Sequence, residues 1–272
     1  MPKKNIISDR QHSIKSNFKC LYKYRSLIYT FALRDIKLQY AQTLLGILWS
    51  IIKPLTGLLI FTLFFDKLLK IDTGDIPYPL FAFIGIISWY YFSYLIQQGG
   101  TSVMQEQNLI KKIYFPKLIL PVSKALAGLV EYSISLILLF IMMLLWGYAP
   151  SFRIIFFPVF IILNIIAGLS IGIWLSALTV RYRDFHHIIP YLISFGIFIT
   201  PVFYPTTLIP PQYHFLIYLN PMAGVIEGFR WTLLREAAPS LWFLISFIPV
   251  ILLFISGLYY FTKIEGKMVD II

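Results

Sequence analysis

The chain has 272 residues, of which 58% are hydrophobic and only 13% are charged, and its formal net charge is +11. Because a soluble domain carries roughly a quarter charged residues, most of this surface must face lipid rather than water, which excludes a soluble enzyme. Nine Lys or Arg residues precede Thr43, and since they adjoin an apolar stretch they indicate membrane topology and contact with membrane lipids rather than nucleic acid.

The first predicted element is an interfacial helix over residues 22–42. Four side chains recur there at helical spacing and form one apolar stripe, whereas Arg34 and Asp35 fall off it. The amphipathicity is imperfect, because Phe31 and Leu38 lie on the far side of the helix. The stripe consists of Tyr29, Leu33, Ile36 and Tyr40.

Six apolar stretches approach the length of about 20 residues that crosses a bilayer. They predict an all-α polytopic membrane protein with six transmembrane helices, in one membrane domain over 43–272 that follows a cytoplasmic N-terminal arm over 1–42. The third stretch is long enough to tilt or protrude, and the fifth is short and ends at Pro201 and Pro205. The six predicted spans are 43–65, 80–104, 117–147, 153–179, 187–204 and 241–262.

The distribution of Lys and Arg predicts which side each connecting segment faces. With the N-terminus inside, most of the cations lie on the cytoplasmic side, which places both termini in the cytoplasm of a multi-pass protein with an even number of crossings. No cleavable signal peptide is expected, because the first forty residues are polar and basic. Beyond the N-terminal arm, the cytoplasmic cations are Lys111, Lys112, Lys117, Arg181, Arg183, Lys263 and Lys267.

The segment Pro205–Ser240 is moderately apolar but too broken by proline to span the membrane. On the outer side it would form short helices that dip into the membrane, which is tolerated only where protein or a cavity covers the backbone. We expect two short helices within Pro205–Arg235. One begins near Pro221 and carries Glu227 and Arg230, since proline suits the first turn of a helix.

Two charges fall near the middle of predicted spans. Lys53 lies in the first span beside Pro54, and Glu131 lies in the third. A lone charge at this depth costs at least about 2.5–3.5 kcal/mol on insertion scales. We therefore expect the two side chains to meet at ion-pair distance or through one water. Separate polar partners, or a position facing a watered channel for either residue, are the alternatives.

The chemistry that the sequence lacks is informative. It contains no G-x-x-x-x-G-K-[ST] motif, so any energy from ATP must come from another polypeptide, and no nucleotide cofactor is expected on this chain. It has no catalytic motif and only one cysteine, Cys20, which permits no internal disulfide. His186 and His187 are adjacent, so both rings cannot readily hold one metal from a helix, and no metal site is expected.

Four blocks of sequence resemble type-2 ABC exporter permeases for lipid-linked polysaccharides. They occur in the family's order and cover nearly the whole chain after residue 25, and their R-Y-R-D-F and P-V-F-Y-P forms look most like the O-antigen subgroup. The last block is the most specific. The blocks are Leu44–Leu55 (LLGILWSIIKPL), Arg181–Pro190 (RYRDFHHIIP), Thr200–Pro205 (TPVFYP) and Leu219–Trp231 (LNPMAGVIEGFRW).

The resemblance implies a homodimer in the bacterial cytoplasmic (inner) membrane that pairs with two copies of a cytoplasmic ATPase, which binds ATP and Mg²⁺. The implied substrate is a glycan carried on a polyprenyl pyrophosphate lipid, and the dimer would enclose its channel. Related permeases export teichoic acid, capsule or small molecules, and these remain alternative functions. A lipid-linked sugar transferase is disfavoured because no clustered carboxylates or histidines lie near one interface. The sugar repeat and the recognition of a terminal cap are not predicted.

A permease without its own ATPase must receive force through its cytoplasmic loops. We expect the segment Asn108–Phe115 to contain a short helix that docks on the ATPase; a plain positive-inside loop is the alternative. The residues of this predicted coupling loop are Asn108, Lys111, Lys112, Tyr114 and Phe115.

Three further sets of site residues are predicted. Arg34 and Lys37 are expected to contact the lipid pyrophosphate, because an Arg fork suits phosphate oxygens, with attraction to anionic lipid as the alternative. An aromatic cluster in the second span supplies candidates for the channel lining, although aromatics also pack and form interface belts. The cluster is Trp89, Tyr90, Tyr91, Phe92 and Tyr94, and the predicted outer gate is Tyr204, Pro205, Asn220, Pro221, Glu227 and Arg230.

Overall fold

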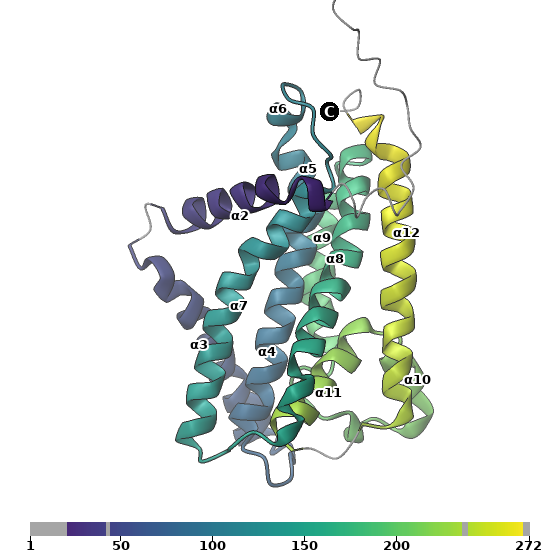
Figure 1. Cartoon of the computed structure of the whole chain (residues 1–272). Coiled ribbons are helices and arrows are strands. Elements are labelled where there is room, and N and C mark those ends of the chain that lie inside the picture. Colours follow the sequence, from purple (N-terminus) through teal and green to yellow (C-terminus); the bar gives the residue numbers. More distant parts are fainter. Residues whose placement is uncertain (1–20, 42–43, 236–238, 269–272) are drawn as a thin grey trace, which may run out of the picture.

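The structure is a computed structural model that describes residues 21–41, 44–235 and 239–268. Helices run along one direction as a bundle, and the described residues contain no strand (Figure 1). Residues 1–20 and 42 of the predicted arm, and Thr43 at the predicted start of the first span, lie outside these residues. The helices are α2 (Arg25–Tyr40), α3 (Trp49–Phe61), α4 (Tyr78–Tyr94), α5 (Gly100–Gln105), α6 (Gln107–Ile110), α7 (Ile119–Leu145), α8 (Phe157–Arg181), α9 (Phe185–Ile199), α10 (His214–Tyr218), α11 (Pro221–Leu233) and α12 (Phe247–Glu265).

Five continuous helical segments of the described chain are long and apolar enough to cross a membrane. They lie within a few residues of five predicted spans, because a run of about 20 apolar residues has few other stable conformations in lipid. The predicted fifth span corresponds to α9, which has only 15 residues and exposes most of its length. The five segments are Gly46–Leu68, Tyr78–Gln105, Ile119–Leu145, Phe152–Arg181 and Leu241–Glu265.

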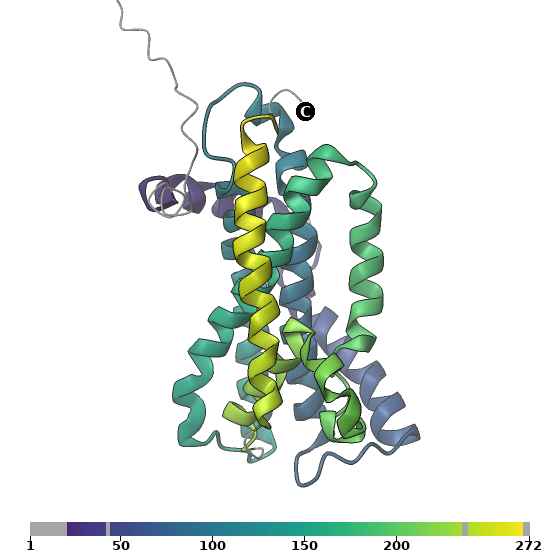
Figure 2. The same cartoon turned by 90° about the vertical axis from the view of Figure 1, so that its right-hand side faces the viewer.

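Helix α2 runs across the direction of the long helices, at the end of the bundle that also holds α6 and the end of α12 (Figures 1 and 2). Its orientation suits an interfacial helix, but the predicted stripe is not its packing face. Tyr29 and Leu33 are exposed, whereas Ile28, Phe31 and Ala32 are buried against the bundle. The stripe is therefore left open to lipid, and its role in the membrane stays a prediction. The face of α2 that packs on the bundle also carries charged residues, which a purely apolar pattern assigns to solvent.

The second spanning segment changes its helical register midway. A π-helical turn, η3 (Leu95–Gly99), separates α4 from α5. Helix α8 packs closely against this turn, because Gly172 has no side chain: a Cβ there would lie 2.7 Å from the carbonyl oxygen of Leu95. Small residues permit such backbone contacts between membrane helices. The turn rotates the residues that follow it relative to those of α4.

The outer segment folds as predicted into two short helices, α10 and α11. Helix α11 begins at Pro221, and the side chain of Asn220 caps it by accepting a hydrogen bond of 3.0 Å from the Met222 amide. Glu227 and Arg230 both lie on α11 and are buried. The helix packs among α4 and α8 at the end of the bundle opposite α2 (Figure 1).

Candidate functional site

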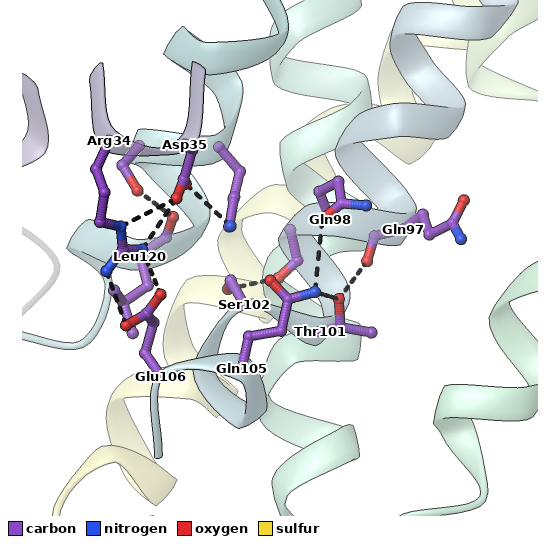
Figure 3. A network of polar contacts seen from close by, with 12 residues as sticks. Arg34, Asp35, Gln97, Gln98, Thr101, Ser102, Gln105, Glu106 and Leu120 are labelled. Carbon is purple, nitrogen blue, oxygen red and sulfur yellow. Dashed lines mark hydrogen bonds and ion pairs between the residues drawn. The ribbon is translucent and has the colours of Figure 1, made fainter. Parts of the chain in front are cut away.

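A charged cluster joins α2 to the rest of the bundle. Lys124 on α7 and Asp35 form an ion pair at 2.9 Å, and both side chains are nine-tenths buried. Arg34 donates to Asp35 at 2.9 Å and to Glu106 at 3.0 Å. Figure 3 shows Arg34, Asp35 and Glu106 converging from two separate segments. A buried pair of this kind is costly to break, so the cluster fixes where α2 sits.

The cluster changes the role expected of Arg34. Its guanidinium is already neutralised by two carboxylates, and the hydrogen bonds that it donates to Glu106 raise its pKa further. The fork that was expected to hold the lipid pyrophosphate is therefore occupied within the chain. Lys37, the other residue predicted for this contact, is exposed.

The predicted coupling loop lies beside α2. Helix α6 occupies Gln107–Ile110, so the expected short helix is present, although it starts one residue earlier and ends well before Phe115. Asn108, Lys111, Lys112 and Tyr114 are exposed at the tip. Phe115 instead is buried, and its ring packs on that of Phe31 with 5.7 Å between centroids. Phe115 thus anchors the loop to α2.

The same loop is tied to the end of α12. The backbone amide of Lys117 donates to a Glu265 carboxylate oxygen at 2.7 Å, and its ammonium donates to the Glu265 carbonyl at 3.0 Å. Burial lowers the pKa of Lys117. Residues far apart in sequence are therefore joined at one end of the bundle, around the loop that was expected to couple to an ATPase.

The two predicted intramembrane charges lie close together. The Nζ of Lys53 is 4.0 Å from Oε1 of Glu131, at the outer limit of an ion pair. Glu131 has a nearer partner in Gln39, whose amide donates at 2.7 Å, and a weaker contact with Ser50 at 3.3 Å. Lys53 and Glu131, together with Tyr90 and other residues, line a small cavity of about 50 Å³. The expected approach of the two charges is confirmed, and its part in transport stays a prediction.

The aromatic cluster divides into two groups. Trp89, Tyr91 and Phe92 are buried inside the single chain, so in this structure they pack rather than line a channel. Tyr91 stacks on Tyr132 with 4.6 Å between ring centroids. Of the five predicted candidates, Tyr90 is 37% exposed and Tyr94 is partly exposed. These two remain as candidates for the channel lining.

A polar stripe on the same spanning segment was not predicted. Gln97, Thr101 and Gln105 recur every four residues, and Gln98 lies beside them (Figure 3). Gln105 donates to the Thr101 hydroxyl at 2.9 Å, and Gln97 and Gln105 are exposed. Amides on a membrane-spanning helix favour a polar neighbour or a water-filled path over lipid. Their spacing of four was visible in the sequence and is the signal that could have identified them.

All six residues of the predicted outer gate lie at the end of the bundle opposite α2, but Arg230 is a structural centre rather than an exposed charge. Its side chain is 1% exposed. It donates to the carbonyls of Pro201 at 2.9 Å and Val202 at 2.7 Å, and it covers the ring of Phe81 at 3.5 Å. The guanidinium thereby joins α11 to α4 and to the loop that follows α9.

Glu227 lines a cavity of about 430 Å³ at this end, together with Tyr218, Thr206 and Pro205. Its carboxylate accepts hydrogen bonds from the Tyr218 hydroxyl at 2.7 and 2.8 Å and from the Thr206 hydroxyl. Burial raises the pKa of Tyr218 to about 12, so it keeps the proton that it donates. The other predicted gate residues have structural contacts. Asn220 caps α11, which begins at Pro221, and also donates to the Thr200 hydroxyl at 2.7 Å. The Tyr204 hydroxyl donates to the Phe198 and Ile199 carbonyls.

Comparisons with known proteins agree with this architecture. An O-antigen export system permease protein RfbA from Myxococcus xanthus is 28% identical over 81% of this chain and 85% of its own length. One from Klebsiella pneumoniae is 23% identical over 96% of this chain and all of its own length. A polysialic acid transport protein KpsM from Escherichia coli is 26% identical over 87% of this chain and 93% of its own length.

The profile of the ABC-2 type transporter family matches residues 26–234, which is well over half of the chain. The matched region starts at α2 and ends with α11. It therefore contains the charged cluster, the coupling loop and the Arg230 centre. The chain belongs to the ABC-2 type transporter family.

Proposed function

We propose that this chain is the permease subunit of an ATP-driven exporter that moves a polysaccharide linked to a polyprenyl pyrophosphate across the bacterial cytoplasmic membrane. The match to the ABC-2 type transporter family over residues 26–234 carries the proposal. Relatives named as O-antigen permeases, aligned over most of their own length, support the polysaccharide as cargo.

We assign ATP hydrolysis to a separate ATPase. The sequence of this chain has no phosphate-binding G-x-x-x-x-G-K-[ST] motif, so ATP and Mg²⁺ would bind to the partner. The exposed tip of the coupling loop, with Lys111 and Lys112, is the surface that we assign to that partner. Phe115 and Lys117 hold the tip to α2 and α12, so a push on the loop would reach both helices.

Two copies of the chain would form the channel. The polar stripe, with Gln98 beside it, is suited to face a path for a hydrated glycan. Helix α9 exposes large apolar side chains, Phe195 and Phe198 among them, which a second copy or lipid would cover. We take α9 as the sixth crossing and α11 as a helix that re-enters from the outer side.

The end of the bundle that holds α2 and α6 would face the cytoplasm. Helices α8 and α12 end there, with Arg181 and Lys263 in their last turns, and the connecting segments at this end contain Lys111 and Arg183. Lys or Arg near the ends of spans favour the cytoplasmic side. Both termini would then be cytoplasmic. Helices α10 and α11 would form the outer gate, with Arg230 holding α11 in place.

A deletion strain tests the proposed function. The expected result is loss of a surface glycan together with accumulation of lipid-linked polymer in the cytoplasm, both restored by the wild-type gene. An unchanged surface glycan would contradict the proposal. The chemistry of the lost glycan also separates an O-antigen from a polymer of the polysialic acid kind, which the similarity to KpsM favours as the second candidate.

A further inference from the structure

A hollow of about 370 Å³ lies between the ends of α8 and α12. Three cations line it, one from the last turn of α8, one from the last turn of α12 and one just after α12, and no acidic side chain does. An aromatic ring and an aliphatic side chain complete the lining. The lining residues are Arg181, Tyr260, Lys263, Ile264 and Lys267.

The three cations of this basic hollow are not neutralised within the described residues. No ion pair there involves Arg181, Lys263 or Lys267. Glu265, the acidic residue between the two lysines in sequence, instead accepts a hydrogen bond from the Lys117 amide at 2.7 Å. The hollow therefore combines three positive charges with space for an anion.

The aromatic lining places the basic hollow at the depth of lipid headgroups. The ring of Tyr260 stacks on Trp174, with 4.7 Å between centroids. Paired Trp and Tyr rings are typical of the membrane–water interface. Lys263 follows Tyr260 by almost one helical turn, about 4.5 Å along the axis, and so lies just outside that interface.

We propose that the basic hollow binds the diphosphate of the lipid carrier in the cytoplasmic leaflet, which rests on the proposed function and refines it. Arg181 would supply a planar fork for phosphate oxygens, and Lys263 and Lys267 would supply point charges. Tyr260, on the membrane side of Lys263, would contact the first isoprenyl units. A diphosphate carries more negative charge than the single phosphodiester of an ordinary phospholipid, which suits three cations at one site.

Two simpler explanations cover less of the arrangement. Cations near helix C-termini are favoured by the helix dipole, but that effect does not require three of them, from two helices, to line one hollow. Docking of an acidic surface of the ATPase would use the cations alone. It would not use Tyr260, which lies on the membrane side of Lys263 along α12.

The test measures binding of a long-chain polyprenyl diphosphate to the full-length permease in complex with its ATPase, in lipid nanodiscs. Arg181→Gln, Lys263→Gln and Lys267→Gln are compared singly and together. Each single change should weaken binding about fivefold and the triple change about 100-fold, because one cation near a membrane surface contributes about that much. Arg181→Lys should recover only part of the loss, because lysine lacks the fork.

A matched control removes the same charge at the same end without touching the basic hollow. Lys23, Arg25 and Arg183 are exposed and do not line it. Their triple change to Gln should bind the diphosphate as the wild type does. Equal loss in the control would overturn the proposal, because general surface charge would then explain the binding.

Two other outcomes also overturn it. Phosphatidylglycerol binding as tightly as the diphosphate, with the same dependence on the three cations, would show a general anionic lipid site. If the triple variant of the basic hollow binds lipid as the wild type does but loses the ATPase from the complex, the basic hollow is a docking surface for the ATPase. The two tests can fail separately, because the binding assay does not depend on export. A normal surface glycan in the deletion strain would contradict the proposed function, whereas the binding results above bear on the basic hollow.

Discussion

Arg230 shows how a charge that is too costly to leave unpaired is used to position a helix. Its guanidinium is enclosed, and its donors point at the carbonyls of Pro201, Val202 and Phe81. These carbonyls belong to α4 and to the loop after α9. A single side chain therefore fixes α11 relative to two other parts of the outer end. It can do so because the planar guanidinium has several N–H donors that reach three carbonyls at once.

The Arg230→Lys variant keeps the charge but cannot reach all three carbonyls at once. Since a hydrogen bond to a charged group contributes about 1.5–3 kcal/mol, we expect a loss of about 2–4 kcal/mol. Thermal unfolding of the purified protein in detergent measures it. The control Arg235→Lys changes an exposed residue at the same end and should stay within about 0.5 kcal/mol. Equal stability of both variants would show that Arg230 does not hold α11.

The close approach of Lys53 to Glu131 predicts that each charge requires the other within the membrane-spanning helices. We expect Lys53→Met to reduce export, because Glu131 would lose a partner 4.0 Å away. Adding Glu131→Gln to the same chain should restore part of the export, since no unpaired charge then remains. Surface glycan in a complemented deletion strain is the readout. Absence of any rescue would argue against an interaction between the two, even though they are close.

At the scale of elements, α2 contacts both ends of the predicted coupling loop: Arg34 binds Glu106, just before the loop, and Phe31 packs on Phe115. We expect a force on the loop to be passed to α2 through these contacts. In Glu106→Gln one carboxylate is lost while Phe115 and the buried Asp35–Lys124 pair remain. The variant should fold, assemble with the ATPase and hydrolyse ATP.

We expect Glu106→Gln to lower the amount of glycan exported per ATP hydrolysed. Both quantities are measured in the same proteoliposomes. Lys23→Gln, at an exposed position just before α2, serves as the control and should leave the ratio at the wild-type value. An unchanged ratio in Glu106→Gln would mean that the contact between Arg34 and Glu106 does not transmit force.

Elements differ in how far the sequence predicts them. Five of the six spans were predictable because apolar length alone determines them, whereas the predicted fifth span corresponds to α9, which has only 15 residues. Helix α11 was predictable because Asn220 and Pro221 specify a helix start. The packing face of α2 was not, because it depends on Lys124, about ninety residues away. The aromatic cluster could not be divided into buried and exposed members, since consecutive residues cover all sides of a helix. No pattern of apolar residues in the sequence distinguishes the π-turn at Leu95–Gly99 from the α-helices on either side of it.

At the scale of the whole molecule, the two ends of the bundle are built differently. The end with α2 gathers exposed cations and the coupling loop, whereas the other end closes around α11 and Arg230. Lys53 and Glu131 lie beside α2, because Gln39 on α2 donates to Glu131 at 2.7 Å. The polar stripe runs along the second spanning segment and reaches the same end at Gln105. This polarity fits a path that loads at one end and is gated at the other.

The most direct test of polysaccharide export is transport by the purified permease and its ATPase in proteoliposomes. Lipid-linked polysaccharide is supplied on the ATPase side, and a lectin or glycosidase reports the glycan that reaches the opposite side. We predict that glycan crosses only with ATP and Mg²⁺ and only when both proteins are present. ATP hydrolysis by the assembled complex, without any glycan reaching the far side, would contradict the account.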